Sequence, residues 1–213
     1  PNFLHEMFEN IRRFPELKVF SAAIEIETSK KIIPSSYSIV KTGDCEVVNY
    51  FDASLKETVI CTSCAVFHKS IFEKTGNFDI QLKSGEDTDL WIRIGLNYPI
   101  LFSWKILARY VYDAQSLTKN HKTIINSLNF SKYTSLEKTN ANLKKFLDLN
   151  RFSLAIKSKI IGDEERFQVF YQEIDLKNLS LKKRILLQLP VFLLKPLIDL
   201  KSILATIGLG NSV

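Results

Sequence analysis

Residues 76–93 read GNFDIQLKSGEDTDLWIR, and the rest of the chain can be interpreted outward from this stretch. Three carboxylates fall within four residues, directly after a Ser-Gly pair. Leu90 and Ile94 lie four residues apart, which is the spacing of a helix face that packs on a core. The stretch therefore predicts a helix from about Glu86 to Asn97, with a carboxylate cluster at its start.

The carboxylate cluster allows two interpretations. In the structural one, Ser84 caps the helix, Asp87 takes the third position of a capping box, and the acids suit the helix dipole. In the functional one, Trp91 and Arg93 flank the acids in a sugar site, because an indole stacks on a pyranose ring and a carboxylate accepts a hydroxyl proton. The Asp87-Thr88-Asp89 segment also matches a short D-x-D metal motif. Residues two apart on a helix point in nearly opposite directions, so we predict no metal site there.

Buried strands are predicted on both sides of this helix. Residues 59–67 are rich in Val, Ile, Cys and Phe, and residues 100–104 and 106–112 have a similar strand-like composition. Near the start of the chain, residues 1–14 repeat apolar side chains at helical spacing, and residues 18–27 end in an alternation of Ile and Glu. Together these patterns predict an α/β body.

The chain changes character after about residue 120. Residues 121–178 are predicted to be mostly helical, because they lack β-branched alternation and repeat apolar side chains at helical spacing. Residues 1–120 carry 14 basic and 15 acidic side chains, net −1, whereas residues 121–213 carry 15 and 8, net +7. We therefore expect two parts, an α/β domain over residues 1–120 and a basic helical appendage over residues 121–213.

The last segment, residues 181–209, is rich in Leu and Ile. Charged residues interrupt it, so its longest charge-free run is too short for a membrane-spanning helix, which needs about 20 apolar residues. Lys182-Lys183-Arg184 come at its start, and its polar side chains share one helix face, a pattern typical of helices that lie in a membrane interface. A helix packed on the protein body is the alternative. Pro190 and Pro196 argue against one straight helix.

Composition and motifs exclude several classes of protein. The chain is 46% hydrophobic and 24% charged, as in ordinary globular domains, so it is neither disordered nor fibrous. It contains no G-x-x-x-x-G-K-[ST] loop and no G-x-G-x-x-G fingerprint. Three cysteines fit a reducing cytosol, and Cys61-x-x-Cys64 lacks a second pair of metal ligands, so a core strand explains both thiols better. The basic residues lack interleaved aromatics, which argues against nucleic-acid binding.

Two motifs together carry a resemblance to a known family. They are the G-x-F-D pattern at Gly76–Asp79 and, after a spacer, the E-D-x-D-L-W-x-R pattern at Glu86–Arg93. Over residues 1–120, the chain resembles the second half of the bacterial glycosyltransferase family 2 domain, which has the GT-A fold. Further similarity lies at Cys61-Thr62-Ser63, Phe72-Glu73-Lys74-Thr75, Pro99-Ile100, Tyr110 and Ser116-Leu117-Thr118.

The resemblance implies an inverting transferase that moves a sugar from a nucleotide-sugar donor to a hydroxyl acceptor, a saccharide or a lipid-linked saccharide, in polysaccharide biosynthesis. Within this pattern, Asp87 would be the catalytic base, with Glu86 beside it as the second catalytic residue. Trp91 would lie at the acceptor site. The further substrate-binding residues that the resemblance implies are Thr62, Ser63 and Arg93.

In that family, the uridine-binding strands and the D-x-D motif that holds a divalent metal, Mg²⁺ or Mn²⁺, precede a segment like Pro1-Asn2-Phe3-Leu4. We therefore expect this chain to be a fragment that carries the acceptor half, lacks the nucleotide-binding half and is inactive in isolation. We expect a cytoplasmic protein, peripheral on the inner face of the cell membrane, whose partners include an anionic membrane surface and exclude nucleic acid. The alternative, from another class, is a non-catalytic carbohydrate- or membrane-binding module.

Overall fold

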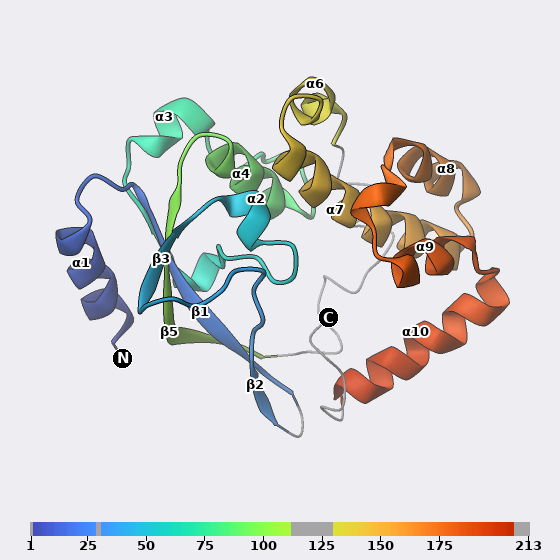
Figure 1. Cartoon of the computed structure of the whole chain (residues 1–213), viewed down its shortest axis with the longest axis horizontal. Helices are drawn as coiled ribbons and strands as arrows, with labels where there is room; N and C mark the ends of the chain where they lie inside the picture. The colour runs from blue at the N-terminus through green and yellow to red at the C-terminus, as the bar shows by residue number, and fades with distance from the viewer. Residues whose placement is uncertain (1, 29–30, 112–129, 207–213) are drawn as a thin grey trace. The chain divides into compact units, whose positions relative to one another are not determined.

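The computed structural model describes residues 2–28, 31–111 and 130–206. The described residues form two compact units, one within residues 1–113 and the other within residues 114–211 (Figure 1). The first unit combines a mixed five-stranded sheet with short helices, and the described part of the second is helical. The chain is therefore a mixed α/β protein, which confirms the α/β class predicted from the sequence.

The first unit alternates short helices and strands. Its first helix, the helix that follows Ser84-Gly85 and its central strand lie close to their predicted positions. Pro15 marks the end of the first helix, Ser84-Gly85 the start of the second, and the Ile-Glu alternation the end of the strand. Its elements in chain order are α1 (Phe3–Arg13), β1 (Val19–Glu27), β2 (Ile32–Pro34), β3 (Cys45–Val48), α2 (Tyr50–Ala53), the 3-10 helix η1 (Thr62–Cys64), β4 (Ala65–Phe67), α3 (Ile71–Thr75), α4 (Glu86–Gly95) and β5 (Ile100–Val111).

The sheet is built around β1 and β5. The strand order is β2-β1-β5-β3, and β4 also pairs with β1. β1 runs parallel to β5 and antiparallel to β2 and β4. The two short strands share one edge of β1, since β4 pairs with Val19–Ser21 and β2 pairs with Glu25–Glu27. Figure 1 shows α1 on one side of this sheet and α2 and α4 on the other.

β5 is one strand where two were predicted. Its pairing with β1 shifts register near Lys105, because Ala22 lies opposite Ser103 while the next residue, Ala23, lies opposite Ile106. The pairing thus skips two residues of β5 and resumes on the far side. The break that the sequence indicated is therefore an irregularity within a continuous strand. Tyr112, the last residue of the prediction, lies outside the described residues.

The strand predicted over residues 59–67 is largely wrong. Only its last three residues form β4, and the three before them form η1, in which Cys64 donates its backbone N–H to the carbonyl of Cys61 at 2.8 Å. This turn buries Cys64 completely and leaves the side chains of Thr62 and Ser63 exposed. In a straight strand, alternate side chains would face the core, so a thiol and a hydroxyl would both be buried. The turn instead buries the thiol of Cys64 and leaves both hydroxyls in solvent.

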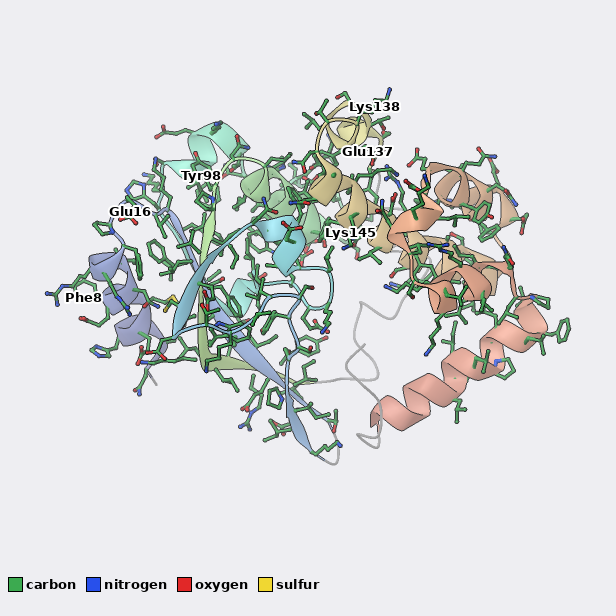
Figure 2. The ribbon with its side chains drawn as sticks, viewed as in Figure 1. Phe8, Glu16, Tyr98, Glu137, Lys138 and Lys145 are labelled. Carbon is green, nitrogen blue, oxygen red and sulfur yellow. The ribbon has the colours of Figure 1, made fainter. Side chains whose placement is uncertain are left out.

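The core under α1 is formed by residues that alternate on β1. Met7 of α1 is buried against Phe20, Ala22 and Ile24, which face the same side of β1. Leu4, Phe8 and Ile11, the apolar residues that recur at helical spacing in α1, lie on its other side. Figure 2 shows Phe8 on the outer side of this helix. The exposed fractions on this side are 76% for Leu4, 58% for Phe8 and 36% for Ile11.

The second unit is a set of helices with well-defined starts. Asn140, Asp163 and Ser180 each accept a hydrogen bond from a backbone N–H of the first helical turn, as N-caps do. The long helix ends at Gly162, whose φ of 79° only glycine adopts readily. Its elements are η3 (Ser131–Tyr133), α6 (Thr134–Glu137), α7 (Ala141–Ile161), α8 (Glu164–Glu173), η4 (Leu176–Asn178), α9 (Leu181–Gln188) and α10 (Val191–Thr206).

A buried arginine ties the helices of this unit together. Arg151 of α7 has no exposed surface, and its guanidinium forms ion pairs with Glu137 at 2.6 Å, Glu173 at 2.8 Å and Asp148 at 3.4 Å. Burial opposes its charge, but the three carboxylates outweigh burial and hold the pKa of Arg151 above its usual value. Asp148, equally buried, also accepts from Lys144 at 2.5 Å. This network links α6, α7 and α8.

The last segment forms two helices, as its prolines predicted. α9 ends before Leu189 and Pro190, and α10 begins at Val191. Pro196, in contrast, lies inside α10 without ending it. Within the described residues, no helix is both long and apolar enough to cross a membrane. Residues 207–209 of the predicted tail lie outside the described part of the chain.

Candidate functional site

The predicted catalytic carboxylates lie in the first turn of α4. Glu86 and Asp87 are both half-buried, and they follow Gly85, whose φ of 80° turns the chain into the helix. Gly85 occupies the N-cap position, so the expectation that Ser84 caps this helix is wrong. One oxygen of Asp87, Oδ1, accepts hydrogen bonds from the backbone N–H of Thr88 at 2.5 Å and from its hydroxyl at 3.2 Å.

The third acid of the cluster has a structural partner. Asp89 is 4% exposed and pairs with Arg93 one turn later, at 2.9 Å. Arg93 also donates to the backbone carbonyl of Thr75, at the end of α3, and to that of Asn77 at 2.9 Å. The guanidinium thus joins α4 to the chain that follows α3, and all three of its nitrogens are used within the protein. The structure therefore gives Arg93 internal partners where substrate contacts were expected.

Trp91 belongs to the core of the first unit. Its ring stacks on Phe67 with 5.4 Å between centroids, and Phe78 meets it edge to face at 6.0 Å. The residue is 3% exposed. An indole covered in this way cannot lie flat on a pyranose ring, so the expectation of a stacking platform does not fit this position. Its contribution is to hold α4 against β4.

Asp87 lies near a buried tyrosine that the sequence did not single out. Tyr50 of α2 is 1% exposed, and its hydroxyl lies 3.3 Å from that of Thr58. Burial raises the pKa of Tyr50, and the charge of Asp87 raises it further, which places the carboxylate within electrostatic range of the phenol. Gly95 makes this arrangement possible, because a Cβ there would lie 2.6 Å from the Cβ of Tyr50. This close contact joins α2 to the C-terminal end of α4.

Glu57 is another titratable residue that the sequence did not single out. It is half-buried next to Thr58 in the chain, and burial raises its pKa. Its charge in turn contributes to the raised pKa of Tyr37, which burial brings to about 12. Carboxyls with raised pKa values are common at functional sites. No local spacing pattern marks Glu57, so only the fold reveals it.

The remaining predicted residues, Thr62 and Ser63, are neighbours on η1. Both side chains are exposed. Within the described residues, no hydrogen bond joins either one to Glu86 or Asp87. The structure thus places the six predicted residues in three settings: a pair of carboxylates at the helix start, two side chains that support α4 from within, and two exposed hydroxyls.

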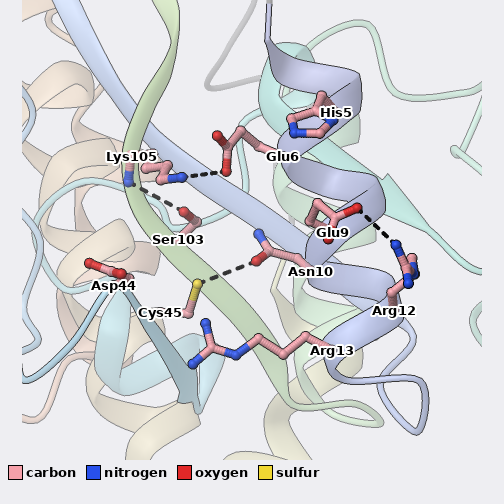
Figure 3. A pocket seen from close by; sticks show the side chains of 10 residues that line it. All are labelled: His5, Glu6, Glu9, Asn10, Arg12, Arg13, Asp44, Cys45, Ser103 and Lys105. Atoms are coloured by element: carbon pink, nitrogen blue, oxygen red, sulfur yellow. Dashed lines mark hydrogen bonds and ion pairs between the residues drawn. The ribbon is translucent and has the colours of Figure 1, made fainter.

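A groove of about 510 Å³ lies elsewhere in the first unit, between α1 and the sheet (Figure 3). Side chains of α1 form one wall, and Cys45 of β3 with Ser103 and Lys105 of β5 forms the other. Two contacts join the walls: Lys105 Nζ lies 2.6 Å from Glu6 Oε2, and the thiol of Cys45 donates to Asn10 Oδ1 at 3.5 Å. The groove is therefore polar, and these two contacts bridge its walls.

The groove has the size and lining of a site for a polar ligand, since ligand pockets commonly span about 300–1,000 Å³. Figure 3 shows the side chain of Arg13 extending away from α1 across the groove, with its guanidinium below Cys45. Arg13 forms no ion pair with a described residue, whereas the ion pair with Glu6 raises the pKa of Lys105. None of the six predicted site residues lines this groove. The sequence could not indicate it, because Glu6 and Lys105 are 99 positions apart.

The described residues do not form a metal site of their own. No group of three or more His, Cys, Asp or Glu side chains among them could hold a metal ion. Asp87 and Asp89 of the D-x-D segment separate as helical geometry requires, one bonded to Thr88 and the other to Arg93. The divalent metal implied by the family resemblance therefore has no set of ligands in the described part of the chain.

Comparison of the chain with protein-family models, with curated proteins and with solved structures gave no match. The first unit thus offers two candidate places for a functional site, the start of α4 and the groove beside α1. Of these, the start of α4 carries the residues with the more specific pattern.

Proposed function

We propose that this chain carries the acceptor side of an inverting, GT-A-type glycosyltransferase of family 2, with Asp87 as the catalytic base. The observation that carries the proposal is the placement of Asp87: a half-buried carboxylate at the N-terminus of a helix that is fixed from behind. Arg93 fixes α4 to the end of α3, and the contact of Gly95 with Tyr50 fixes it to α2. A base must be held within hydrogen-bond reach of its proton, and these contacts provide such support.

In the proposed reaction, Asp87 accepts the proton of an acceptor hydroxyl while that oxygen attacks the anomeric carbon of the donor. The bond from the anomeric carbon to the nucleotide diphosphate breaks, and the configuration inverts because attack and departure occur on opposite faces. Oδ1 of Asp87 is occupied by Thr88, which leaves Oδ2 for the acceptor. Glu86, in the same turn, is the second acid of the site, and the exposed hydroxyls of Thr62 and Ser63 are proposed to bind substrate.

The other components of the proposal follow from the family resemblance. The donor is a nucleotide-sugar, and the acceptor is a saccharide or a lipid-linked saccharide. Because the described residues offer no metal ligand set, we derive no step through a metal ion. The resemblance assigns the nucleotide and a divalent cation such as Mg²⁺ or Mn²⁺ to a nucleotide-binding half, and the reaction to the cytoplasmic side of the membrane.

The test is Asp87→Asn in the longest natural protein that contains this sequence. Transfer from a panel of nucleotide-sugars to saccharide acceptors is measured, and the variant should lose about 10²- to 10⁴-fold in kcat, the usual contribution of a general base. Glu73→Gln on α3 is the matched control, since it neutralises an exposed carboxylate of the same unit. Near-normal turnover of Asp87→Asn would show that Asp87 serves only the start of the helix.

The groove favours a second candidate, a non-catalytic carbohydrate-binding module. Its polar walls and its volume suit a saccharide without any reacting group. NMR titration of the isolated chain with oligosaccharides separates the two candidates. Shifts confined to α1, β3 and β5 support the binding module, whereas shifts at Glu86, Asp87 and η1 support an acceptor site.

A further inference from the structure

α10 exposes an apolar face that it does not use for packing. Leu194 is fully buried and holds the helix on its unit, where α10 contacts α7. Leu193, Leu197 and Leu200 recur at helical spacing on a different face, roughly 90° around the helix from Leu194. They are 46%, 48% and 53% exposed, and Phe192 beside them is 73% exposed. If the apolar side chains of α10 served only to pack the helix on its unit, this face would be buried.

α9 continues the pattern. Leu181 and Ile185 lie one turn apart on one side of the helix and are 72% and 49% exposed, while Leu187 on another side is buried. Over the two helices, seven large apolar side chains therefore face solvent within twenty residues of sequence. We call them the tail surface: Leu181, Ile185, Val191, Phe192, Leu193, Leu197 and Leu200.

The charge around the tail surface is predominantly positive. Residues 180–206 contain five basic side chains and one acidic side chain, Asp199. Three of the five, Lys182-Lys183-Arg184, form the first turn of α9, between Leu181 and Ile185. The Lys182 side chain is exposed. Apolar side chains edged by cations are the pattern by which helices bind anionic lipid surfaces, where the chains enter the headgroup boundary and the cations meet phosphates.

We propose that α9 and α10 bind the surface of an anionic lipid bilayer through the tail surface. The chemistry favours a lipid partner over a second copy of this chain, because two copies would bring segments of net charge +4 together. It favours lying on the bilayer over crossing it, because no described helix is long and apolar enough to span one. The inference does not depend on the reaction proposed above, since it concerns the other unit and a different partner.

The experiment is vesicle co-sedimentation of the whole chain. Phosphatidylcholine vesicles are compared with vesicles in which part of that lipid is replaced by phosphatidylglycerol. Binding should require the anionic lipid and fall with added salt. Leu197→Gln with Leu200→Gln should lower the partition coefficient about tenfold or more, because two apolar side chains leave the lipid boundary. Lys182→Gln should lower it about fivefold, as expected for one basic residue near an anionic leaflet.

Two matched controls lie in the same unit. Val169→Gln changes an apolar residue of α8 that is 52% exposed, and Lys138→Gln removes an exposed cation after α6; neither should alter binding. Circular dichroism checks folding, and Phe192→Ser provides a second variant if the double one loses helix. Equal sedimentation of wild type and tail variants, or equal binding to both kinds of vesicle, would overturn the proposal. So would a dimer without lipid, seen by sedimentation velocity, that the tail variants dissociate.

Discussion

The buried arginine of the second unit provides the sharpest test of how this chain is stabilised. Replacing Arg151 with Met keeps much of its length and removes its charge. Glu137, labelled in Figure 2 at the end of α6, then loses the partner of both its oxygens, which lie 2.6 and 3.2 Å from the guanidinium. Its side chain is only 9% exposed, so water cannot replace the lost contacts without movement of α6.

The size of the effect follows from what each carboxylate retains. Asp148 keeps hydrogen bonds from Lys144 and from Asn178, at 2.5 and 2.7 Å, and Glu173 is 39% exposed. The cost therefore falls mainly on Glu137, and breaking a buried ion pair by removing one partner typically costs about 3–5 kcal/mol. Replacing both partners by Met should recover most of this loss, because no uncompensated charge then remains in the interior.

The measurement is urea unfolding followed by circular dichroism at a helix wavelength, which reports on the helical second unit. Arg166→Met is the matched control: its ion pair with Asp163 is 3.3 Å long, with side chains 41% and 33% exposed, and should contribute less than about 1 kcal/mol. If Arg151→Met lowered the free energy of unfolding no more than Arg166→Met does, the network would not be a stabilising element. If the double Met variant were no better than the single one, the buried Glu137 charge would not be the cause.

Three further predictions concern the first unit. Gly95→Ala should lower the free energy of unfolding by about 1–3 kcal/mol, because the added Cβ meets the Tyr50 side chain at 2.6–2.9 Å; thermal unfolding followed by tryptophan fluorescence measures it, and an unchanged midpoint would contradict the close contact. Burial raises the pKa of Glu57, so the native state binds more protons than the unfolded chain above the ordinary glutamate pKa of about 4.3, and stability should fall as pH rises through that range. Glu57→Gln should remove this part of the pH dependence in urea titrations, and an unchanged profile would assign it elsewhere. Arg93→Lys should cost about 1–3 kcal/mol, because one ammonium cannot reach the Asp89 carboxylate and two carbonyls together; a neutral result in the same unfolding assay would mean that these bonds are dispensable.

The elements that the sequence predicted well are those with a local signal. α1 ends just before Pro15, β1 alternates Ile with Glu, and α9 begins after the capping Ser180. Each of these signals lies within the element or next to it, so no knowledge of the fold is needed. The 59–67 segment failed because its composition fits a strand, while the need to bury Cys64 and expose its hydroxyl neighbours decides the actual turn.

The candidate site depends more on contacts between distant residues. Glu86 and Asp87 were found because they are adjacent, and they do lie together at a helix start. Trp91 was assigned to a sugar because an indole suits both a core and a carbohydrate, and only its contacts with Phe67 and Phe78 distinguish these roles. The approach of Asp87 to Tyr50 spans 37 positions, which no spacing rule reaches.

The hydrogen bonds of Arg93 also determine where residues can be inserted or deleted between α3 and α4. The guanidinium holds the carbonyls of Thr75 and Asn77 at one end of the connection to α4, and Gly85 forms its other end. The middle of this connection forms a separate turn with its own backbone hydrogen bond, and Ile80 in this turn is 97% exposed. Loop closure entropy grows slowly with length, so added residues in this turn cost little. Insertions and deletions around Ile80 can therefore accumulate in evolution while the carboxylates of α4 keep their place.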